Sequence, residues 1–176
     1  MVHVLEEHLF NLEHQRSRMD RLIDTVRKTL ASVKGEYVMS DEEKFAVFKE
    51  KLVKENEEQY GEEIRKKWGD GPVDESNRKV LNMSEQDWEH FKNLEQEIRE
   101  RLEKSVNSGI RADSQEAEAI VALHREWLSM SWSQYTSEAH KSMGVMYTCD
   151  ERFRKYYDEH VPGCAEFLRQ AIDYHA

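Results

Sequence analysis

Aromatic, methionine and histidine side chains gather in residues 124–147, which makes this stretch the first candidate for binding chemistry. Adaptable methionines beside rigid aromatic rings are typical of apolar pockets, and histidines at the two ends supply polar groups that orient a ligand. Plain core packing explains the same residues, Trp127 and Met146 above all, so both interpretations stay open. The candidates in this stretch are His124, Trp127, Met130, Trp132, Tyr135, His140, Met143, Met146 and Tyr147.

No motif for catalysis or for a cofactor accompanies this stretch. The sequence lacks a Walker A loop, GxGxxG, HExxH, GxSxG and an EF-hand loop, and its eight histidines are scattered along the chain. We therefore expect no enzyme, no cofactor and no metal site. A helical hydrolase or a haem protein stays open as an alternative, in which His124 or His140 would be the haem ligand.

Composition narrows the class of protein further. The 176 residues include 7 Gly and 2 Pro, too few for the many tight turns of an all-β protein, so long helices are expected. With 26 basic and 36 acidic residues the net charge is −10, which disfavours direct contact with DNA or with an anionic membrane surface. No apolar run is long enough to cross a bilayer, no signal peptide is apparent, and Cys149 and Cys164 form no CxxC, so we expect a cytoplasmic protein.

Residues 2–33 carry a heptad pattern that predicts a dimerising coiled-coil helix. Nine of the ten seam positions are apolar. The exception, Arg16, lies near the middle of the seam, where it would influence the register and the orientation of the two paired helices. A helix folded back on its own domain is the alternative, but such a helix usually has a wider apolar stripe. The predicted dimerisation residues are Leu5, Leu9, Leu12, Arg16, Met19, Ile23, Val26 and Leu30.

The chain after this arm is predicted to be a compact all-α domain of six or seven helices, which divides the protein into 1–35 and 40–176. Gly35 ends the arm, and Ser40 with Glu43 forms a capping box for the next helix. The run 69–72, Gly-Asp-Gly-Pro, is predicted to be a loop, and Ser84, Asp113 and Asp150 are predicted to open later helices. Residues 1–34 have a net charge of +1, and the remainder has a net charge of −11. The negative charge of the body favours cationic ligands at long range.

Several segments of the body resemble the TipAS antibiotic-recognition domain, over roughly residues 40–174. The most specific are Tyr-Gly-Glu-Glu-Ile-Arg at 60–65 and Asp-Glu-Arg-Phe at 150–153; others lie at 40–45, 83–88, 124–125, 139–147 and 162–172. The arm is similar to the helix that precedes this domain in TipA-like and Mta-like regulators of the MerR family, where two copies pair antiparallel. Regulators of this type also carry an N-terminal winged helix-turn-helix, which is absent here, so DNA contact is expected only through that missing part.

The resemblance implies a globin-like helical domain that senses bulky, multi-ring apolar antibiotics such as thiopeptides and so regulates transcription. Its ligand cleft is expected to be lined by 124–147, with contributions from 45–68 and from 88–98, where Trp88 and Phe91 lie. Some members capture the ligand through a cysteine two residues after the histidine that corresponds to His140, and this chain has Ser142 there. A coiled-coil adaptor that binds another protein and no small molecule is the alternative function.

Because an unactivated serine hydroxyl is a poor nucleophile, we expect binding through the Ser142 position to be reversible. Incubation with thiostrepton followed by intact mass spectrometry should return the mass of the unmodified chain. A stable adduct would contradict this expectation, and peptide mapping of the adduct would identify the residue that had reacted.

Overall fold

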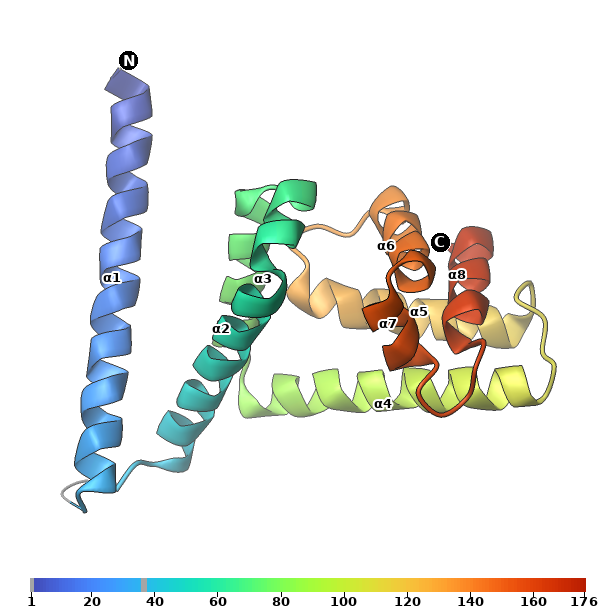
Figure 1. The fold of residues 1–176 in the computed structure, drawn as a ribbon, viewed down its shortest axis with the longest axis horizontal. Helices are drawn as coiled ribbons and strands as arrows, with labels where there is room; N and C mark the ends of the chain where they lie inside the picture. The colour runs from blue at the N-terminus through green and yellow to red at the C-terminus, as the bar shows by residue number, and fades with distance from the viewer. Residues whose placement is uncertain (1, 36–37) are drawn as a thin grey trace. The chain divides into compact units, whose positions relative to one another are not determined.

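The computed structural model describes residues 2–35 and 38–176, without the side chains of residues 2–8, 10, 11, 14, 17, 18 and 21. Every regular element within these ranges is an α-helix, which confirms the all-α prediction (Figure 1). None of the described helices is both long enough and apolar enough to cross a bilayer. The helices are α1 (Val2–Val33), α2 (Asp41–Trp68), α3 (Asp70–Asn82), α4 (Glu85–Asn107), α5 (Gln115–Ser131), α6 (Ser137–Cys149), α7 (Glu151–Tyr157) and α8 (Cys164–His175).

The chain divides into two compact units, Met1–Lys54 and Glu55–Ala176, and α2 runs without a break through the division. The first unit holds α1 and the beginning of α2, and the second holds the rest of α2 with α3 to α8. The domain division predicted from the sequence, 1–35 and 40–176, lies earlier, at the turn between α1 and α2, and it stays a prediction.

The heptad seam of α1 is exposed from Leu9 to Val33, where its side chains are described. Its apolar side chains from Leu9 to Val33 are between 43% and 81% exposed, and Arg16 is exposed as well. Leu5, which the sequence also assigns to the seam, lies among the side chains outside the description. The long helix is therefore confirmed, and its pairing with a second chain remains a prediction.

Local capping interactions set most of the helix ends. At the start of α2, the Ser40 backbone N–H donates to Glu43 Oε2 over 3.0 Å, and the Glu43 N–H donates to Ser40 Oγ over 3.2 Å. The same reciprocal pattern joins Ser84 and Asp87 at the start of α4. These two capping boxes confirm what the sequence predicts, because both partners lie within three residues of each other.

Two predicted helix starts differ from the structure. The run 69–72 is not a loop: only Gly69 lies outside a helix, with φ of 84°, and α3 begins at Asp70. Pro72 fits there because the first turn of a helix leaves its backbone N–H groups without helical partners. At α5 the cap is Ser114, whose Oγ accepts from the Ala117 N–H, whereas Asp113 forms an ion pair with Arg111.

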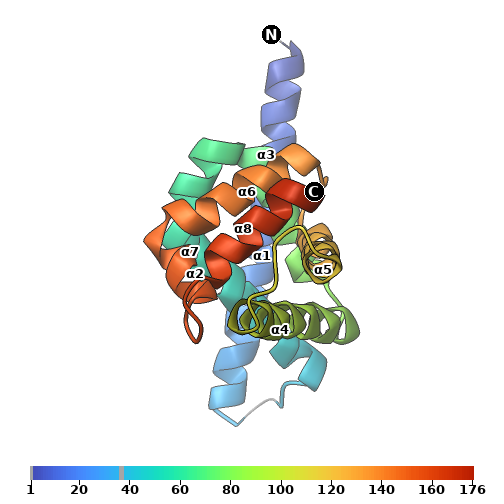
Figure 2. The same ribbon diagram turned by 90° about the vertical axis from the view of Figure 1, so that its right-hand side faces the viewer.

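The core of the second unit lies where α4, α5, α6 and α8 pack against one another (Figure 2). Leu102, Ile120, Leu168 and Ile172 contribute fully buried side chains from three of these helices. Gly144 lies where α6 packs against α8, and a Cβ at this position would be in van der Waals contact with Ile172, 3.4 Å from its Cδ1.

A hydrogen-bonded pair of histidines lies inside this core and joins α5 to α6. His124 Nδ1 and His140 Nε2 are 2.7 Å apart, and both side chains are fully buried. The hydroxyls of Tyr147 and Tyr157 are each 3.3 Å from His124 Nε2, and the hydroxyl of Tyr135 is 2.9 Å from His140 Nδ1. All four ring nitrogens therefore have partners, as buried polar atoms require.

Burial favours the neutral form of both imidazoles. It lowers the pKa of His124 to about 3, with a further contribution from His140, and it lowers the pKa of His140 to about 4, with a further contribution from Arg125. Geometry acts in the same direction, since two imidazolium ions at this distance would point N–H donors at each other. The pair is thus a neutral hydrogen-bonded connection between two helices.

This pair predicts that the protein loses stability as the pH falls. Below the ordinary histidine pKa of 6.5 the unfolded chain binds protons that the folded chain does not, so the free energy of unfolding should fall between pH 6.5 and 4.5. His140→Gln retains a donor and an acceptor but does not titrate, so it should reduce the slope by up to about 1.4 kcal/mol per pH unit.

Chemical denaturation at several pH values measures this slope. His160→Gln, at an exposed position outside the core, is the matched control and should keep the wild-type slope. Equal slopes for wild type and His140→Gln would show that the buried pair does not govern the acid sensitivity.

Candidate functional site

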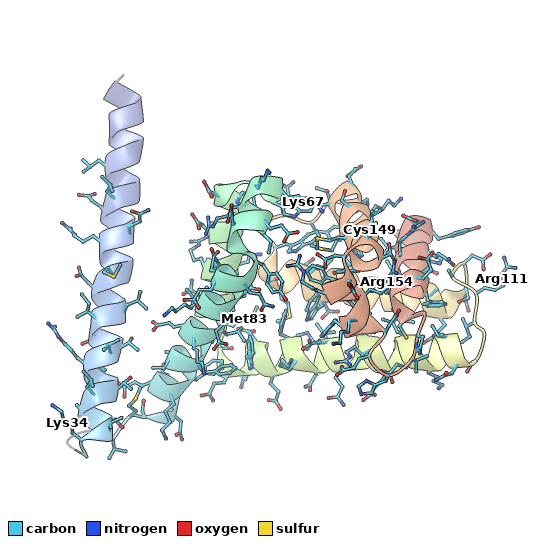
Figure 3. The ribbon with its side chains drawn as sticks, viewed as in Figure 1. Lys34, Lys67, Met83, Arg111, Cys149 and Arg154 are labelled. Carbon is cyan, nitrogen blue, oxygen red and sulfur yellow. The ribbon has the colours of Figure 1, made fainter. Side chains whose placement is uncertain are left out.

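A cleft of about 440 Å³ in the second unit is the candidate binding site. One wall is the C-terminal part of α2, and the other is the corner where α6 meets α7. Figure 3 labels Lys67 on the α2 side and Cys149 on the α6 side. The lining residues are Tyr60, Glu63, Ile64, Lys67, Trp68, Val145, Met146, Cys149, Asp150, Glu151, Arg152 and Phe153.

Helical spacing explains the wall that α2 supplies. Tyr60, Ile64 and Trp68 follow each other at intervals of four residues, so they lie on one face of the helix. All three are half-buried and apolar or aromatic. The wall therefore offers a continuous nonpolar surface with two aromatic rings, which is the kind of surface that binds the flat faces of ligands.

An ion-pair network behind this wall holds the end of α2 against α3. The guanidinium of Arg65 donates to Glu57 on its own helix, over 3.0 and 3.1 Å, and to Asp70 and Asp74 at the start of α3, over 3.1 and 2.7 Å. These carboxylates raise the pKa of Arg65, with Glu57 as the largest contributor. Asn77 Nδ2 also donates to Glu57, over 2.6 Å.

Gly61 makes room for this network. A Cβ at this position would lie 2.7 Å from Glu57 Oε2, closer than side-chain atoms normally approach. The absence of a side chain lets the Glu57 carboxylate lie along α2 and reach both Arg65 and Asn77. A glycine in the middle of a helix lowers its intrinsic stability. At Gly61 this residue is explained by the space that the Glu57 carboxylate occupies.

Arg152 connects the two walls of the cleft. Its guanidinium donates to Asp150, at the start of its own helix α7, and to Glu63 Oε2 on α2 over 2.8 Å. It also lies over the Tyr60 ring, 5.1 Å from the ring centroid. Arg152 lowers the pKa of Asp150 to about 2, so this carboxylate stays charged at neutral pH. Asp150 also caps α7 by accepting from the Arg152 N–H.

Aromatic contacts continue from the cleft to the buried histidine pair. The centroid of the Tyr60 ring lies 6.1 Å from that of Phe153, and the Phe153 ring lies 6.1 Å from the Tyr147 ring. Tyr147 in turn meets His124 edge to face, with centroids 5.6 Å apart. The side of the cleft formed by α6 and α7 thus rests on the hydrogen-bonded pair in the core.

Of the predicted ligand-binding residues, Met146 lines the cleft and Tyr147 packs directly behind it. His124 and His140 are placed in the core, where their nitrogens bond to each other and to tyrosines. This arrangement disfavours the haem alternative, because an iron ligand needs a free imidazole nitrogen. In the described part of the chain no group of three or more potential metal-ligating side chains is present.

The other predicted residues lie outside the cleft lining. Trp88, Phe91 and Trp127 form a stack between α4 and α5, with successive centroids 5.7 and 5.1 Å apart. Further positions are distributed as follows: Trp132 stacks on Tyr135, Met143 packs against the core, Met130 is half-buried and Ser142 is exposed. Their contribution to ligand binding stays a prediction.

Met146 is the one lining residue that the sequence names as a site residue; those missed are the residues of α2 and α7, the cap residue Asp150, and Val145 and Cys149 on α6. The sequence assigns 45–68 to the cleft as a segment, and it places Tyr60, Ile64 and Trp68 on one helix face without naming them as site residues. Arg152 and Phe153 come two and three residues after the helix cap at Asp150, but nothing in their spacing shows that they meet α2. Cys149 lines the cleft whereas Ser142 does not, and the second cysteine, Cys164, is buried and outside the lining.

Comparison with known proteins agrees with this architecture. Residues 60–175 match the model of the TipAS antibiotic-recognition domain. The chain is 29% identical over 161 residues to the HTH-type transcriptional activator Mta of Bacillus subtilis, which covers 92% of this chain and 62% of that protein. It is 31% identical over 135 residues to the HTH-type transcriptional activator TipA of Streptomyces coelicolor, covering 76% of this chain and 52% of TipA.

A solved structure supports the fold. TipAS from Streptomyces lividans, in complex with the thiopeptide antibiotic nosiheptide, matches with a TM-score of 0.59 and 29% sequence identity, over 78% of this chain and 94% of that one. The curated relatives are longer, and the chain spans 62% of Mta and 52% of TipA. From the family model and the shared helical fold, the chain belongs to the TipAS antibiotic-recognition domain family.

Proposed function

We propose that this chain is the effector-binding and dimerisation portion of a MerR-family transcriptional activator, and that it binds bulky, multi-ring apolar antibiotics reversibly. The observation that carries the proposal is the cleft of about 440 Å³ between α2 and the α6–α7 corner. Its volume is within the range of small-molecule sites, and seven of its twelve lining residues are apolar or aromatic while five are charged. A relative with the same fold, TipAS, is known in complex with nosiheptide.

Binding is driven by removal of apolar surface from water between two walls that belong to different parts of the chain. Tyr60, Ile64 and Trp68 cover the ligand from α2, and Met146 and Phe153 cover it from the other side. A ligand that contacts both walls favours the conformations in which the walls are close together, so it shifts a population. Since α2 begins directly after the α1–α2 turn, we propose that this shift alters the geometry of the arm.

The arm is proposed to pair with that of a second copy in an antiparallel dimer, and DNA contact is assigned to a winged helix-turn-helix outside this chain. Support for the pairing comes from the exposed apolar seam of α1, since large apolar side chains repeated every three and four residues favour a helical partner. The relatives are transcriptional regulators, which fits a non-enzymatic role, and we propose that the chain works in the cytoplasm.

Ligand binding in the cleft predicts a specific effect of removing an aromatic ring from its wall. Tyr60→Ala should weaken nosiheptide binding by about tenfold or more, since one lost ring contact of about 1.4 kcal/mol corresponds to a factor of ten. Titration followed by tryptophan fluorescence, with the shift in thermal midpoint as a second readout, measures the dissociation constant.

Tyr174→Ala is the matched control, because this tyrosine is 69% exposed on α8 and does not line the cleft. It should bind nosiheptide as the wild type does. Equal affinities for wild type and Tyr60→Ala would place the ligand elsewhere. If no antibiotic in a broad panel changes the fluorescence or the thermal midpoint, the adaptor function is the better account.

Pairing through α1 predicts that charge on the seam dissociates the dimer. The double variant Ile23→Glu/Val26→Glu places two carboxylates where apolar side chains would meet, so its mass in solution should fall to that of the monomer. Multi-angle light scattering after size-exclusion chromatography gives this mass. Asp24→Lys changes an exposed residue at an outward-facing b position of the heptad and should stay dimeric, and a wild type that is already monomeric would contradict the proposal.

A further inference from the structure

Two of the five charged residues that line the cleft have no ion-pair partner in the described part of the chain. Arg152 is shared by Asp150 and Glu63, so these three side chains largely compensate one another. The remaining two are Lys67 on α2 and Glu151 on α7. Any charge preference of the cleft at short range therefore depends on these two residues.

The surroundings of Glu151 account for its charge without a ligand. It is the first residue of α7, where the partial positive charge of the helix N-terminus stabilises a carboxylate. The residue is also exposed, so water solvates it. Glu151 therefore requires no partner in the cleft.

Lys67 is exposed as well, but it differs in position, because its ammonium group extends from one wall of the cleft to the other. Its Nζ lies 3.7 Å from Met146 Sδ on α6, and 5.2 Å from the ring centroid of the neighbouring Trp68. A thioether is a weak acceptor and a ring face supplies no lone pair, whereas an ammonium group has three donors. Lys67 thus holds a positive charge beside apolar cleft walls with most of its hydrogen-bonding capacity left to water.

We propose that Lys67 determines the charge specificity of the cleft by binding an anionic group, a carboxylate or sulfonate, on an aromatic ligand. The rings of such a ligand lie against Tyr60 and Trp68, and its acidic oxygen accepts from the Lys67 ammonium. This inference rests on the proposed function, since it assigns a ligand class to the same cleft. It contrasts with the long-range effect of the acidic body, which attracts cations but is screened over about 8 Å at physiological salt.

Two dyes with a common ring skeleton separate charge from apolar contact. The anionic probe is 8-anilinonaphthalene-1-sulfonate, and the neutral probe is N-phenyl-1-naphthylamine, which lacks the sulfonate. Lys67→Met retains an unbranched side chain without its charge, and it should weaken binding of the anionic dye on the order of fivefold while leaving the neutral dye unchanged. Lys67→Arg keeps the positive charge, so this variant should bind the anionic dye almost as tightly as the wild type.

Lys66→Met is the matched control, since Lys66 is an exposed neighbour on α2 that does not line the cleft. It removes the same charge from the same helix and should affect neither dye. Tyr60→Ala should weaken both dyes, which would place them in the cleft.

Several outcomes would overturn the inference. Equal weakening of both dyes by Lys67→Met would show that the side chain acts as an apolar wall. Equal effects of Lys66→Met and Lys67→Met on the anionic dye would show that only the general field matters. A wild type that binds the neutral dye in the cleft but not the anionic one would exclude selection of anions, whereas failure of both dyes to bind would count against the cleft as a ligand site, and so against the proposed function itself.

Discussion

The hydrogen bond between His124 and His140 is the interaction on which the α6–α7 side of the cleft rests. Two fully buried imidazoles must satisfy their polar atoms inside the protein, and this requirement connects α6 to α5, which both pack against α8. Tyr147 packs edge to face on His124, and its ring also contacts the ring of Phe153. The cleft residues of α6 and α7 therefore have a rigid base, although they lie near the surface themselves.

The opposite wall is held by a different kind of interaction. Half-exposed ion pairs centred on Arg65 join α2 to α3, and Arg152 connects α2 to α7 through Glu63. Such pairs contribute little free energy each, and they weaken as salt screens them. One side of the cleft is thus anchored in a packed core and the other by polar contacts that can rearrange, which is a suitable combination for a site that responds to a ligand by a population shift.

The structure explains the two short motifs by which the sequence most resembles the TipAS family. In the run Tyr-Gly-Glu-Glu-Ile-Arg at 60–65, Tyr60 and Ile64 line the cleft, and Gly61 makes room for the Glu57 carboxylate. Glu63 pairs with Arg152 of α7, and Arg65 pairs with two aspartates of α3. In the run 150–153, Asp150 caps α7 and pairs with Arg152, while Phe153 stacks on Tyr60. The two motifs that carry the resemblance in the sequence are therefore the two sides of one cleft.

The sequence by itself determined the helices, the capping boxes at Ser40 and Ser84 and the apolar seam of α1, because each depends on residues within one or two helical turns. Local signals were misleading at 69–72, where glycine and proline suit the start of α3 as well as a loop. Only the tertiary structure decided which aromatic residues face the cleft. Periodicity shows that a helix has an apolar face, but not whether that face meets the core or a ligand: His124 and Trp127 pack inside, while Tyr60 and Phe153, 93 residues apart, meet at the site.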